Sequence, residues 1–522
     1  MRSRAVIFAV LGAGLMACTA AKTPAARPSP QPTTIAYEVR LASIDPWILD
    51  VRATFEGGAA RGAIAFPAAA SQISVEERGA RRSPEQHGRS FLLGCEGTCT
   101  VRYRYDLSAA AELTQDAASV AVRSGGDVVA PGSIWLMRPE PVDPWARATL
   151  RVETGDSASF AAPFPRDEIT GEYRLLARDI GALGYTVWGQ FTTVPVRATE
   201  GRADVVVLRG ERRADDAALG RWMTATAAAL DTVYGRFPVP RVLVAVVPSP
   251  GSDGVDFGRT VPAGGASIIL FVGDHASEDD LLDDWVLAHE MVHLGIPSMP
   301  RDGRWIDEGL ATYYEPVIRA RAGLLSERAA WAELRAKMPR GVATREEPSL
   351  ATAEDHDRVY FGGSVFALAA DVEIRRRTGG ARSLDDGMRR ALAEGASATL
   401  VWPIERFVAA LDRGAGTPVV RELFERVSGR DAPCAPSAPA LSAGPAACAP
   451  DDAAAVLALF DALGVTRSGG DEVELDDAAR LAHVRRSIGR MDEGVAATVA
   501  RSAPRTAAGA WSARTKAGAE RP

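Results

Sequence analysis

The residues whose types and spacing most clearly suit a chemical reaction lie in one short stretch, His289-Glu290-Met291-Val292-His293. Histidines four positions apart lie on the same face of a helix, so their imidazoles can bind a single metal ion. Glu290 points about 100° around the helix from His289, where it can reach a metal-held water without binding the metal. The chain has only six histidines, and two fall here, which argues against a chance pair of surface residues. The stretch therefore predicts a hydrolytic metal site.

A catalytic zinc site needs a third protein ligand and an open fourth position. Glu308 is the candidate, within the segment Trp305-Ile306-Asp307-Glu308-Gly309-Leu310-Ala311. Two prolines and a glycine between 297 and 303 predict a turn, after which a second helix folds back and Glu308 faces the histidines. The adjacent Asp307 is the alternative ligand.

The element that must carry the histidines is a helix predicted over 277–295. Ser277 is followed by three acidic residues, which is typical of a capped helix start, and Gly295 marks the helix end. Asp284 and Thr312 are candidates to orient a metal-binding imidazole through a hydrogen bond.

The surrounding region predicts a mixed α+β domain over 199–430. Short β-branched runs at 205–208, 242–247 and 266–272 predict strands, and 215–234 has the apolar stripe of a helix. The Gly-rich stretch 249–259 is expected to be a loop. Nearly everything after 272 is predicted to be helical, out to about 430.

Residues 35–198 show short alternating apolar runs separated by Gly/Pro-rich turns, which predict a β-sandwich-like domain. The fold class is therefore multidomain α+β, with a β-rich N-terminal domain followed by a catalytic domain that is mainly helical in its second half. A small C-terminal region is expected over 451–495, and a disordered tail over 496–522.

The HExxH stretch followed by W-x-x-E-G-x-A-x-Y resembles the gluzincin zinc metallopeptidases. The resemblance covers roughly residues 200–430 and implies a thermolysin-like fold for the catalytic domain. It also implies that His289, His293 and Glu308 bind one Zn²⁺ and that Glu290 is the general base acting on the zinc-bound water.

Downstream segments extend the resemblance to the glycyl aminopeptidase family within the gluzincins. They are a Tyr-x-x-Gly helix start at Tyr360 and a Gly-Gly-x-x-Ser-Leu-Asp-Asp run over 379–386. The resemblance implies that Tyr360 stabilises the oxyanion, since a phenolic hydroxyl can donate to developing charge; the alternative is a tyrosine that only packs at the helix start. His356 could assist Tyr360 or be a solvated loop residue.

The resemblance also implies that the strand before the histidine helix is an edge strand that pairs with the substrate backbone. We assign it to Gly264, Gly265, Ala266 and Ser267. This segment lacks the Glu that holds the substrate amine in the better-known aminopeptidase branch, so exopeptidase and endopeptidase action both stay open.

These features predict a zinc metallopeptidase that hydrolyses peptides or proteins, as an aminopeptidase or oligopeptidase at the cell envelope. A catalytically retired peptidase fold with a binding or envelope role is one alternative, and a zinc hydrolase of a non-peptide bond is another. With 60 Lys and Arg against 67 Asp and Glu the net charge is −7, and no basic cluster is present. A nucleic-acid partner is therefore not expected.

The N-terminus has the pattern of a secretory signal. Arg2 and Arg4 precede an apolar run over 5–17, which is too short to span a bilayer. The end of the run, Leu15-Met16-Ala17-Cys18, resembles the bacterial lipoprotein box. This resemblance implies a signal peptide over 1–17, lipidation of Cys18, a flexible tether over 18–34 and membrane anchoring. It also implies that Thr19 favours the outer membrane, with the protein facing the periplasm or the surface. An ordinary cleaved signal is the alternative.

The other four cysteines predict two local disulfides, Cys95–Cys99 and Cys434–Cys448, the second closing a Pro/Ala-rich loop over 431–450. Disulfides indicate an oxidising compartment. Zinc binding is the alternative, but neither pair has Cys-x-x-Cys spacing or a neighbouring histidine.

Overall fold

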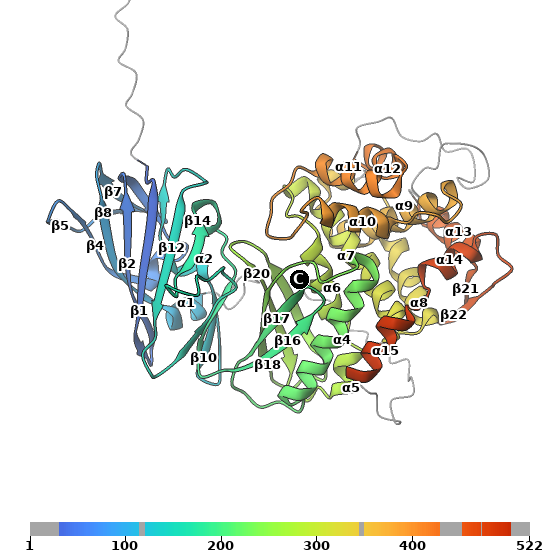
Figure 1. Ribbon diagram of the computed structural model, residues 1–522, viewed down its shortest axis with the longest axis horizontal. Helices are drawn as coiled ribbons and strands as arrows, with labels where there is room; N and C mark the ends of the chain where they lie inside the picture. Colours follow the sequence, from blue (N-terminus) through green and yellow to red (C-terminus); the bar gives the residue numbers. More distant parts are fainter. Residues whose placement is uncertain (1–30, 114–120, 344–348, 429–451, 471, 503–522) are drawn as a thin grey trace, which may run out of the picture.

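A computed structural model describes residues 31–113, 121–343, 349–428, 452–470 and 472–502. The predicted signal peptide, Cys18, and the pair Cys434 and Cys448 lie outside the described residues. Figure 1 shows a β-rich part at the blue end of the chain and, beside it, a sheet covered by helices.

The N-terminal domain consists of sheets that pack around one apolar core. The strand β2 shows the predicted alternation, since every second side chain is buried. The predicted disulfide Cys95–Cys99 is present and joins the end of β7 to the start of β8. The seven-stranded sheet has the order β14 (Tyr173–Leu176), β12 (Arg147–Glu153), β1 (Thr34–Ile44), β2 (Trp47–Glu56), β8 (Cys99–Asp106), β4 (Ala70–Glu77) and β5 (Ala80–Arg82).

Smaller elements complete this domain. One four-stranded sheet has the order β13 (Ser159–Ala161), β15 (Tyr185–Gly189), β10 (Asp127–Pro131) and β9 (Val122–Ser124). The other has the order β11 (Arg138–Glu140), β3 (Ala59–Ala63), β7 (Ser90–Cys95) and β6 (Glu85–His87). The short helices are α1 (Leu107–Leu113), α2 (Gly132–Trp135) and α3 (Ala177–Ile180).

The second domain, predicted to be catalytic, is built on a five-stranded sheet with the order β16 (Thr192–Ala198), β17 (Gly201–Val207), β18 (Val242–Ser249), β20 (Ala266–Gly273) and β19 (Val255–Val261). The three inner strands are parallel, and both edge strands are antiparallel to their neighbours. Two predictions are corrected. The strand β16 precedes the boundary predicted at residue 199, and β19 occupies part of the predicted loop over 249–259.

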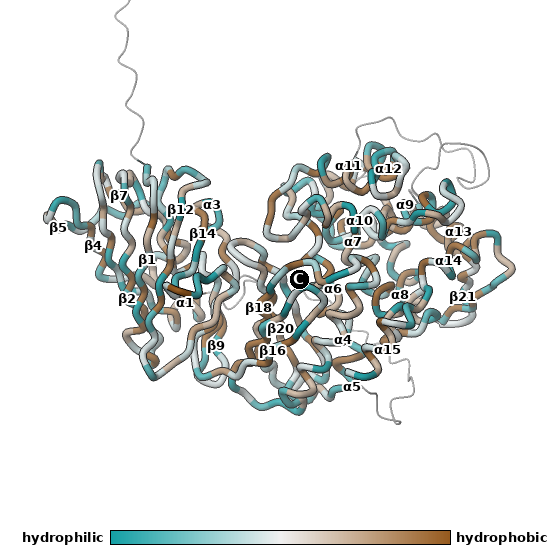
Figure 2. The backbone as a smooth tube through the Cα atoms, in the orientation of Figure 1, coloured by the Kyte–Doolittle hydropathy of each residue, from teal (hydrophilic) through white to brown (hydrophobic). Residues whose placement is uncertain are grey.

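Both faces of this sheet are covered. Helices pack on one face, and β10 and β15 of the N-terminal domain contribute to an apolar cluster on the other (Figure 1). Strands buried on both faces are expected to be apolar throughout, and β18 begins Val-Leu-Val-Ala-Val-Val with all six residues buried. The strands of this sheet accordingly include long apolar stretches in Figure 2.

The helix predicted over 277–295 is divided in two. Its capping box at Ser277 and Asp280 is present, but the first helix ends at Leu282. Asp284 then accepts the backbone N–H of Val286 at 2.8 Å, which stabilises a second helix start. The helices in chain order are α4 (Asp216–Tyr234), α5 (Glu278–Leu282), α6 (Val286–Val292), α7 (Arg304–Arg321), α8 (Glu327–Lys337), α9 (Gly363–Arg377), α10 (Leu384–Ala393), α11 (Ile404–Ala415) and α12 (Val419–Val427).

The C-terminal region packs on the helices of the second domain. Arg321 of α7 donates to the carbonyl of Ile488 at 2.7 Å, and Arg375 of α9 donates to Ser487 at 3.2 Å. The predicted disorder is wrong for residues 496–502, because α15 buries Val499 and packs against α4. The elements are α13 (Ala453–Leu463), β21 (Val465–Gly469), β22 (Glu472–Leu475), α14 (Ala482–Ile488) and α15 (Glu493–Ser502).

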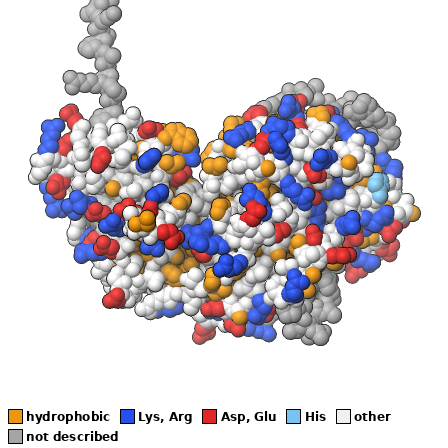
Figure 3. Space-filling view, viewed as in Figure 1, with side chains coloured by type: hydrophobic (Ala, Val, Ile, Leu, Met, Phe, Trp, Pro, Cys, Tyr) orange, Lys and Arg blue, Asp and Glu red, His pale blue; other side chains and the backbone are white. Residues whose placement is uncertain are grey.

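The surface carries charges of both signs. Figure 3 shows Lys and Arg intermixed with Asp and Glu over the face in view, and an indentation between the β-rich domain and the second domain. Within the described ranges, none of the helices combines the length and the apolar character that crossing a membrane requires.

Candidate metal centre

The helix α6 carries His289, and His293 directly follows it as the first residue of a 3₁₀ turn at His293–Gly295. The helix is held from two sides. On one side, β19 comes so close that a Cβ on Gly258 would lie 2.5 Å from Val286 Cγ1 and 2.9 Å from Glu290 Cγ. On the other side, the hydroxyl of Tyr234 on α4 donates to the carbonyl of Val292 at 2.7 Å, satisfying one of the free carbonyls at the helix end. The orientation of α6 is therefore set by its packing against the sheet and α4.

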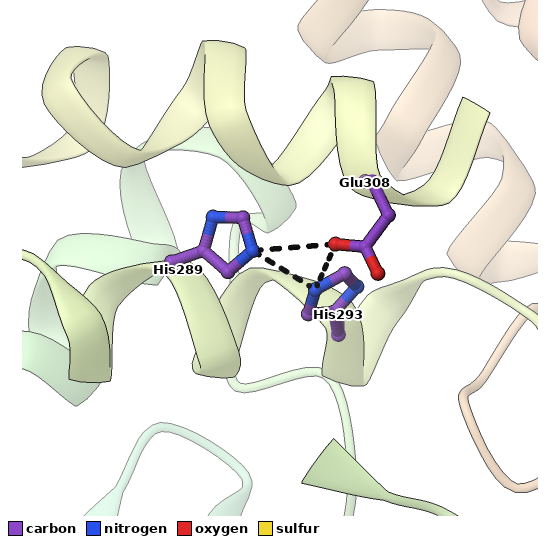
Figure 4. A group of neighbouring side chains, drawn as sticks. All are labelled: His289, His293 and Glu308. Atoms are coloured by element: carbon purple, nitrogen blue, oxygen red, sulfur yellow. Dashed lines mark hydrogen bonds and ion pairs between the residues drawn. The ribbon is translucent and has the colours of Figure 1, made fainter. Parts of the chain in front are cut away.

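Three side chains converge between α6 and α7. The Nε2 atoms of His289 and His293 are 3.3 Å apart, and each lies 3.5 Å from Oε2 of Glu308. Figure 4 shows Glu308 reaching from α7 towards the imidazoles of His289, on α6, and His293, just after its end. The turn predicted over 297–303 contains a 3₁₀ helix at Arg301–Gly303 and brings α7 back onto α6. The structure thus brings together the three predicted ligands.

The spacing of these atoms matches what a tetrahedral metal ion requires. Ligands about 2.1 Å from a tetrahedral zinc ion are separated from one another by about 3.4 Å. The three observed separations of 3.3, 3.5 and 3.5 Å agree with this value. Two imidazole nitrogens and one carboxylate oxygen also form a donor set found in catalytic zinc sites.

Asp307 determines which nitrogen of His293 is available. Its Oδ1 lies 2.6 Å from His293 Nδ1, and since an ionised carboxylate can only accept, Nδ1 carries the hydrogen. In the neutral imidazole, the lone pair is then on Nε2, which faces His289 and Glu308. Asp307 is therefore a partner of a candidate ligand rather than the third ligand itself.

Neighbouring charges shift the pKa values of His293 and Glu308. Burial would lower the pKa of His293, but Asp307 and then Glu308 raise it well above the usual range. Burial would raise the pKa of Glu308, yet His289 and His293 hold it well below its ordinary value. Glu308 is therefore an anion at neutral pH and a candidate ligand.

Glu290 lies next to the histidines without joining them. It is 8% exposed, and its Oε2 lies 2.8 Å from the hydroxyl oxygen of Thr260, which is also 2.9 Å from the Glu290 carbonyl oxygen. Thr260 belongs to β19, so the edge strand of the sheet orients this carboxylate. The arrangement suits a general base placed beside a metal site.

Tyr360 lies against the same cluster, within a π-helical turn at Arg358–Gly362. Its ring stacks on His289 at 6.1 Å between centroids, and on His356 at 4.3 Å. Burial raises the pKa of Tyr360 and Glu308 raises it further, while Arg304 acts in the opposite direction. Tyr360 therefore remains protonated at neutral pH and can donate a hydrogen bond.

The helices that carry Glu308 and Tyr360 meet at two glycines. A Cβ on Gly309 would lie 2.3 Å from the carbonyl carbon of Gly363, and a Cβ on Gly363 would lie 2.2 Å from the carbonyl oxygen of Trp305. Only glycine permits this approach of the two backbones. The contact fixes the distance between the third candidate ligand and the tyrosine.

The predicted substrate strand is misplaced. Ala266 and Ser267 begin β20, which lies inside the sheet between β18 and β19. Ser267 is fully buried, and its hydroxyl accepts from the Tyr185 N–H and donates to the Val261 carbonyl. Gly264 and Gly265 pack closely against residues 163, 164 and 183 of the N-terminal domain. The edge strand beside α6 is β19.

The candidates for orienting an imidazole are also corrected. The carboxylate of Asp284 accepts the N–H groups of Val286 and Val255, and so joins α6 to the start of β19. The hydroxyl oxygen of Thr312 is buried without a hydrogen-bond partner. Asp307 takes the predicted orienting role for His293.

Three residues near the site were not assigned a function from the sequence: Asp307 as a partner of His293, Thr260 as a partner of Glu290, and Arg304. The guanidinium of Arg304 lies 3.8 Å from Oε1 of Glu308 and 5.9 Å from the ring centroid of Tyr360. Arg304 precedes Glu308 by four residues, and this helical spacing was the available signal.

No family model matches the chain, and no curated protein matches it in sequence. Solved structures do match it. An aminopeptidase N family protein from Idiomarina loihiensis is 14% identical, with 70% of each chain covered and a TM-score of 0.53. An M1 zinc metallopeptidase from Deinococcus radiodurans is 16% identical, covering 78% of this chain and 96% of that one, with a TM-score of 0.48. Legionella pneumophila aminopeptidase A in complex with aspartic acid is 12% identical, covering 76% and 48%, with a TM-score of 0.49. The likeness to the first confirms the predicted multidomain α+β fold.

Proposed function

We propose that this protein is a zinc-dependent peptidase. The observation that carries the proposal is the tetrahedral spacing of His289, His293 and Glu308, with the carboxylate of Glu290 on the same helix. The fold shared with an aminopeptidase N family protein supports the same class of reaction. Retention of every required group argues against a retired peptidase fold.

The residues divide the reaction among them. Zinc, when bound by His289, His293 and Glu308, would lower the pKa of a water molecule and polarise the scissile carbonyl. Glu290 accepts a proton from the attacking water and passes it to the leaving amine. Thr260 holds the Glu290 carboxylate in position while this occurs.

Tyr360 and β19 act on the substrate. The protonated phenol of Tyr360 donates to the negative charge that develops on the carbonyl oxygen. The edge strand β19 offers backbone hydrogen bonds to an extended peptide, which would align the scissile bond beside α6. An extended peptide is therefore a more favoured substrate than other carbonyl compounds.

The test is Glu290→Gln. The amide cannot take up the proton, so we expect peptide hydrolysis to fall by about 10²-fold or more while bound zinc stays unchanged. Glu472→Gln, an exposed change on β22, serves as the control and leaves both measurements unaltered. Full hydrolysis by Glu290→Gln would refute the base assignment, and folded protein without bound zinc would refute the metal site.

The place of action is proposed to be the envelope of a bacterium, with the chain anchored through a lipid on Cys18. The lipoprotein-like signal and the disulfide Cys95–Cys99 support an oxidising compartment. We expect the wild-type chain to be labelled by a radioactive fatty acid and the Cys18→Ser chain to remain unlabelled. An unlabelled wild-type chain would contradict the anchor and leave the peptidase proposal standing.

A further inference from the structure

Arg304 is a cation at the rim of the candidate metal centre with no role in the steps above. It is the first residue of α7 and its side chain is 54% exposed. Its closest carboxylate oxygen, Oε1 of Glu308, lies 3.8 Å away, beyond hydrogen-bond distance. A guanidinium offers five N–H donors in a planar fork, so Arg304 keeps donors for a ligand beside its contacts with Glu308 and Tyr360.

The carboxylates around the centre are already engaged. Glu308 faces the histidines, Asp307 accepts from His293, and Glu290 is bound to Thr260. Asp284 accepts two backbone N–H groups. A substrate ammonium group would have to compete for these carboxylates, whereas an anionic group would meet the half-exposed cation of Arg304.

The position of Arg304 suits the binding of a substrate group better than a role in stabilising the fold. Its guanidinium lies near the Tyr360 ring, at 5.9 Å from the centroid, so it is held close to the group that contacts the reacting carbonyl. The fork of an arginine matches a carboxylate in two parallel hydrogen bonds. An anionic group that binds there would lie within one or two residues of the scissile bond.

We propose that Arg304 binds a carboxylate of the substrate next to the scissile bond, so that the enzyme prefers acidic peptides. The carboxylate can be an Asp or Glu side chain or a free C-terminus, since both present the same two oxygens. This inference rests on the proposed peptidase function and adds its substrate class.

The experiment compares matched peptides. One pair carries Glu or Gln beside the cleaved bond, and a second pair ends in a free carboxylate or an amide, which separates the two sources. We expect wild-type kcat/KM to favour an acidic member by roughly tenfold or more, as for a hydrogen bond to a charged group. Arg304→Gln should remove this preference, and Arg304→Glu should favour a Lys peptide instead.

The control is Arg301→Gln. Arg301 lies three residues before Arg304, is 86% exposed, and pairs with Glu354 at 2.8 Å. It should keep the wild-type preference, and bound zinc should be unchanged in every variant. A uniform loss of kcat/KM on acidic and neutral peptides in Arg304→Gln, or a wild-type enzyme without acid preference, would overturn the inference.

A binding measurement separates this inference from the peptidase proposal. The Glu290→Gln protein should bind the acidic peptides with a Kd roughly tenfold lower than the neutral ones, and adding Arg304→Gln should remove the difference. Equal Kd values would overturn the role of Arg304. A wild-type protein that cleaves no peptide but shows the acid-selective binding would overturn the peptidase proposal alone.

Discussion

Gly363→Ala tests how closely α7 and α9 must approach for the site to form. The added Cβ would lie 2.2 Å from the carbonyl oxygen of Trp305 and 2.7 Å from the Cα of Gly309. Unstrained contacts between such atoms need roughly 3.5 Å, so the helices must separate by about 1 Å. Trp305 is 1% exposed, meets Phe366 edge to face and stacks on Phe424, which leaves little room for another adjustment.

Two opposing contributions set the change in stability. Replacing glycine by alanine inside a helix normally stabilises it by about 1 kcal/mol. Overpacking of a tight contact costs typically about 1–3 kcal/mol, and the backbone atoms met here cannot rotate away. We therefore expect a net loss of unfolding free energy. A displacement of about 1 Å between Glu308 and Tyr360 should also lower kcat/KM by about 10²-fold.

The assay combines urea unfolding, bound zinc and peptide hydrolysis. Gly494→Ala is the matched control, because Gly494 lies in α15 and a Cβ there meets only Asp492 Oδ1 at 3.4 Å. We expect the control to be at least as stable as wild type and fully active. If Gly363→Ala behaves like the control in all three measurements, the glycine contact does not position the site.

Two further changes test the metal partner and a surface ion pair. Asp307→Ala should weaken zinc binding by roughly tenfold to hundredfold in competition with a chelator, since His293 loses the partner that orients it. The exposed Asp302→Ala is the control and should leave the zinc affinity unchanged. An unchanged zinc affinity in Asp307→Ala would contradict the role of Asp307. Arg413 and Arg390 lower the pKa of Glu394 from 4.5 to about 2, so its contribution to stability is present above pH 4.5 and is lost as pH falls through 2. The stability difference between wild type and Glu394→Gln should therefore shrink over that range in urea unfolding, and a difference that does not change with pH would contradict the reasoning.

The part of the site that could be predicted from the sequence depends on local geometry. His289 and His293 share a helix face because of the helical period, and the turn over 297–303 brings Glu308 back towards them. The choice between Asp307 and Glu308 depends on the rotation of α7 about its axis. That rotation is set by the Gly309–Gly363 contact with α9, which no local pattern contains.

The errors share a cause in non-local contacts. Glycines at 254 and 258 make the segment of β19 resemble a loop, yet pairing with β20 makes it a strand, and Gly258 is required where α6 approaches. The helix α15 has the composition of a disordered tail, and its packing against α4 orders it. In both cases the partner is distant in sequence, so composition alone indicated the wrong state.

The chemistry of the proposed site is divided between two sets of elements. The candidate base Glu290 and the candidate ligand His289 lie on α6, and His293 directly follows it. The strand β19 holds α6 through Thr260 and the Asp284–Val255 hydrogen bond. The third candidate ligand and Arg304 lie on α7, and Tyr360 lies in the π-helical turn before α9. The glycine contact joins α7 to α9. The candidate ligands, base and tyrosine are brought together where α6 contacts α7. The His293–Asp307 hydrogen bond crosses that interface directly, which makes Asp307 both the partner of a ligand and a link between the two halves.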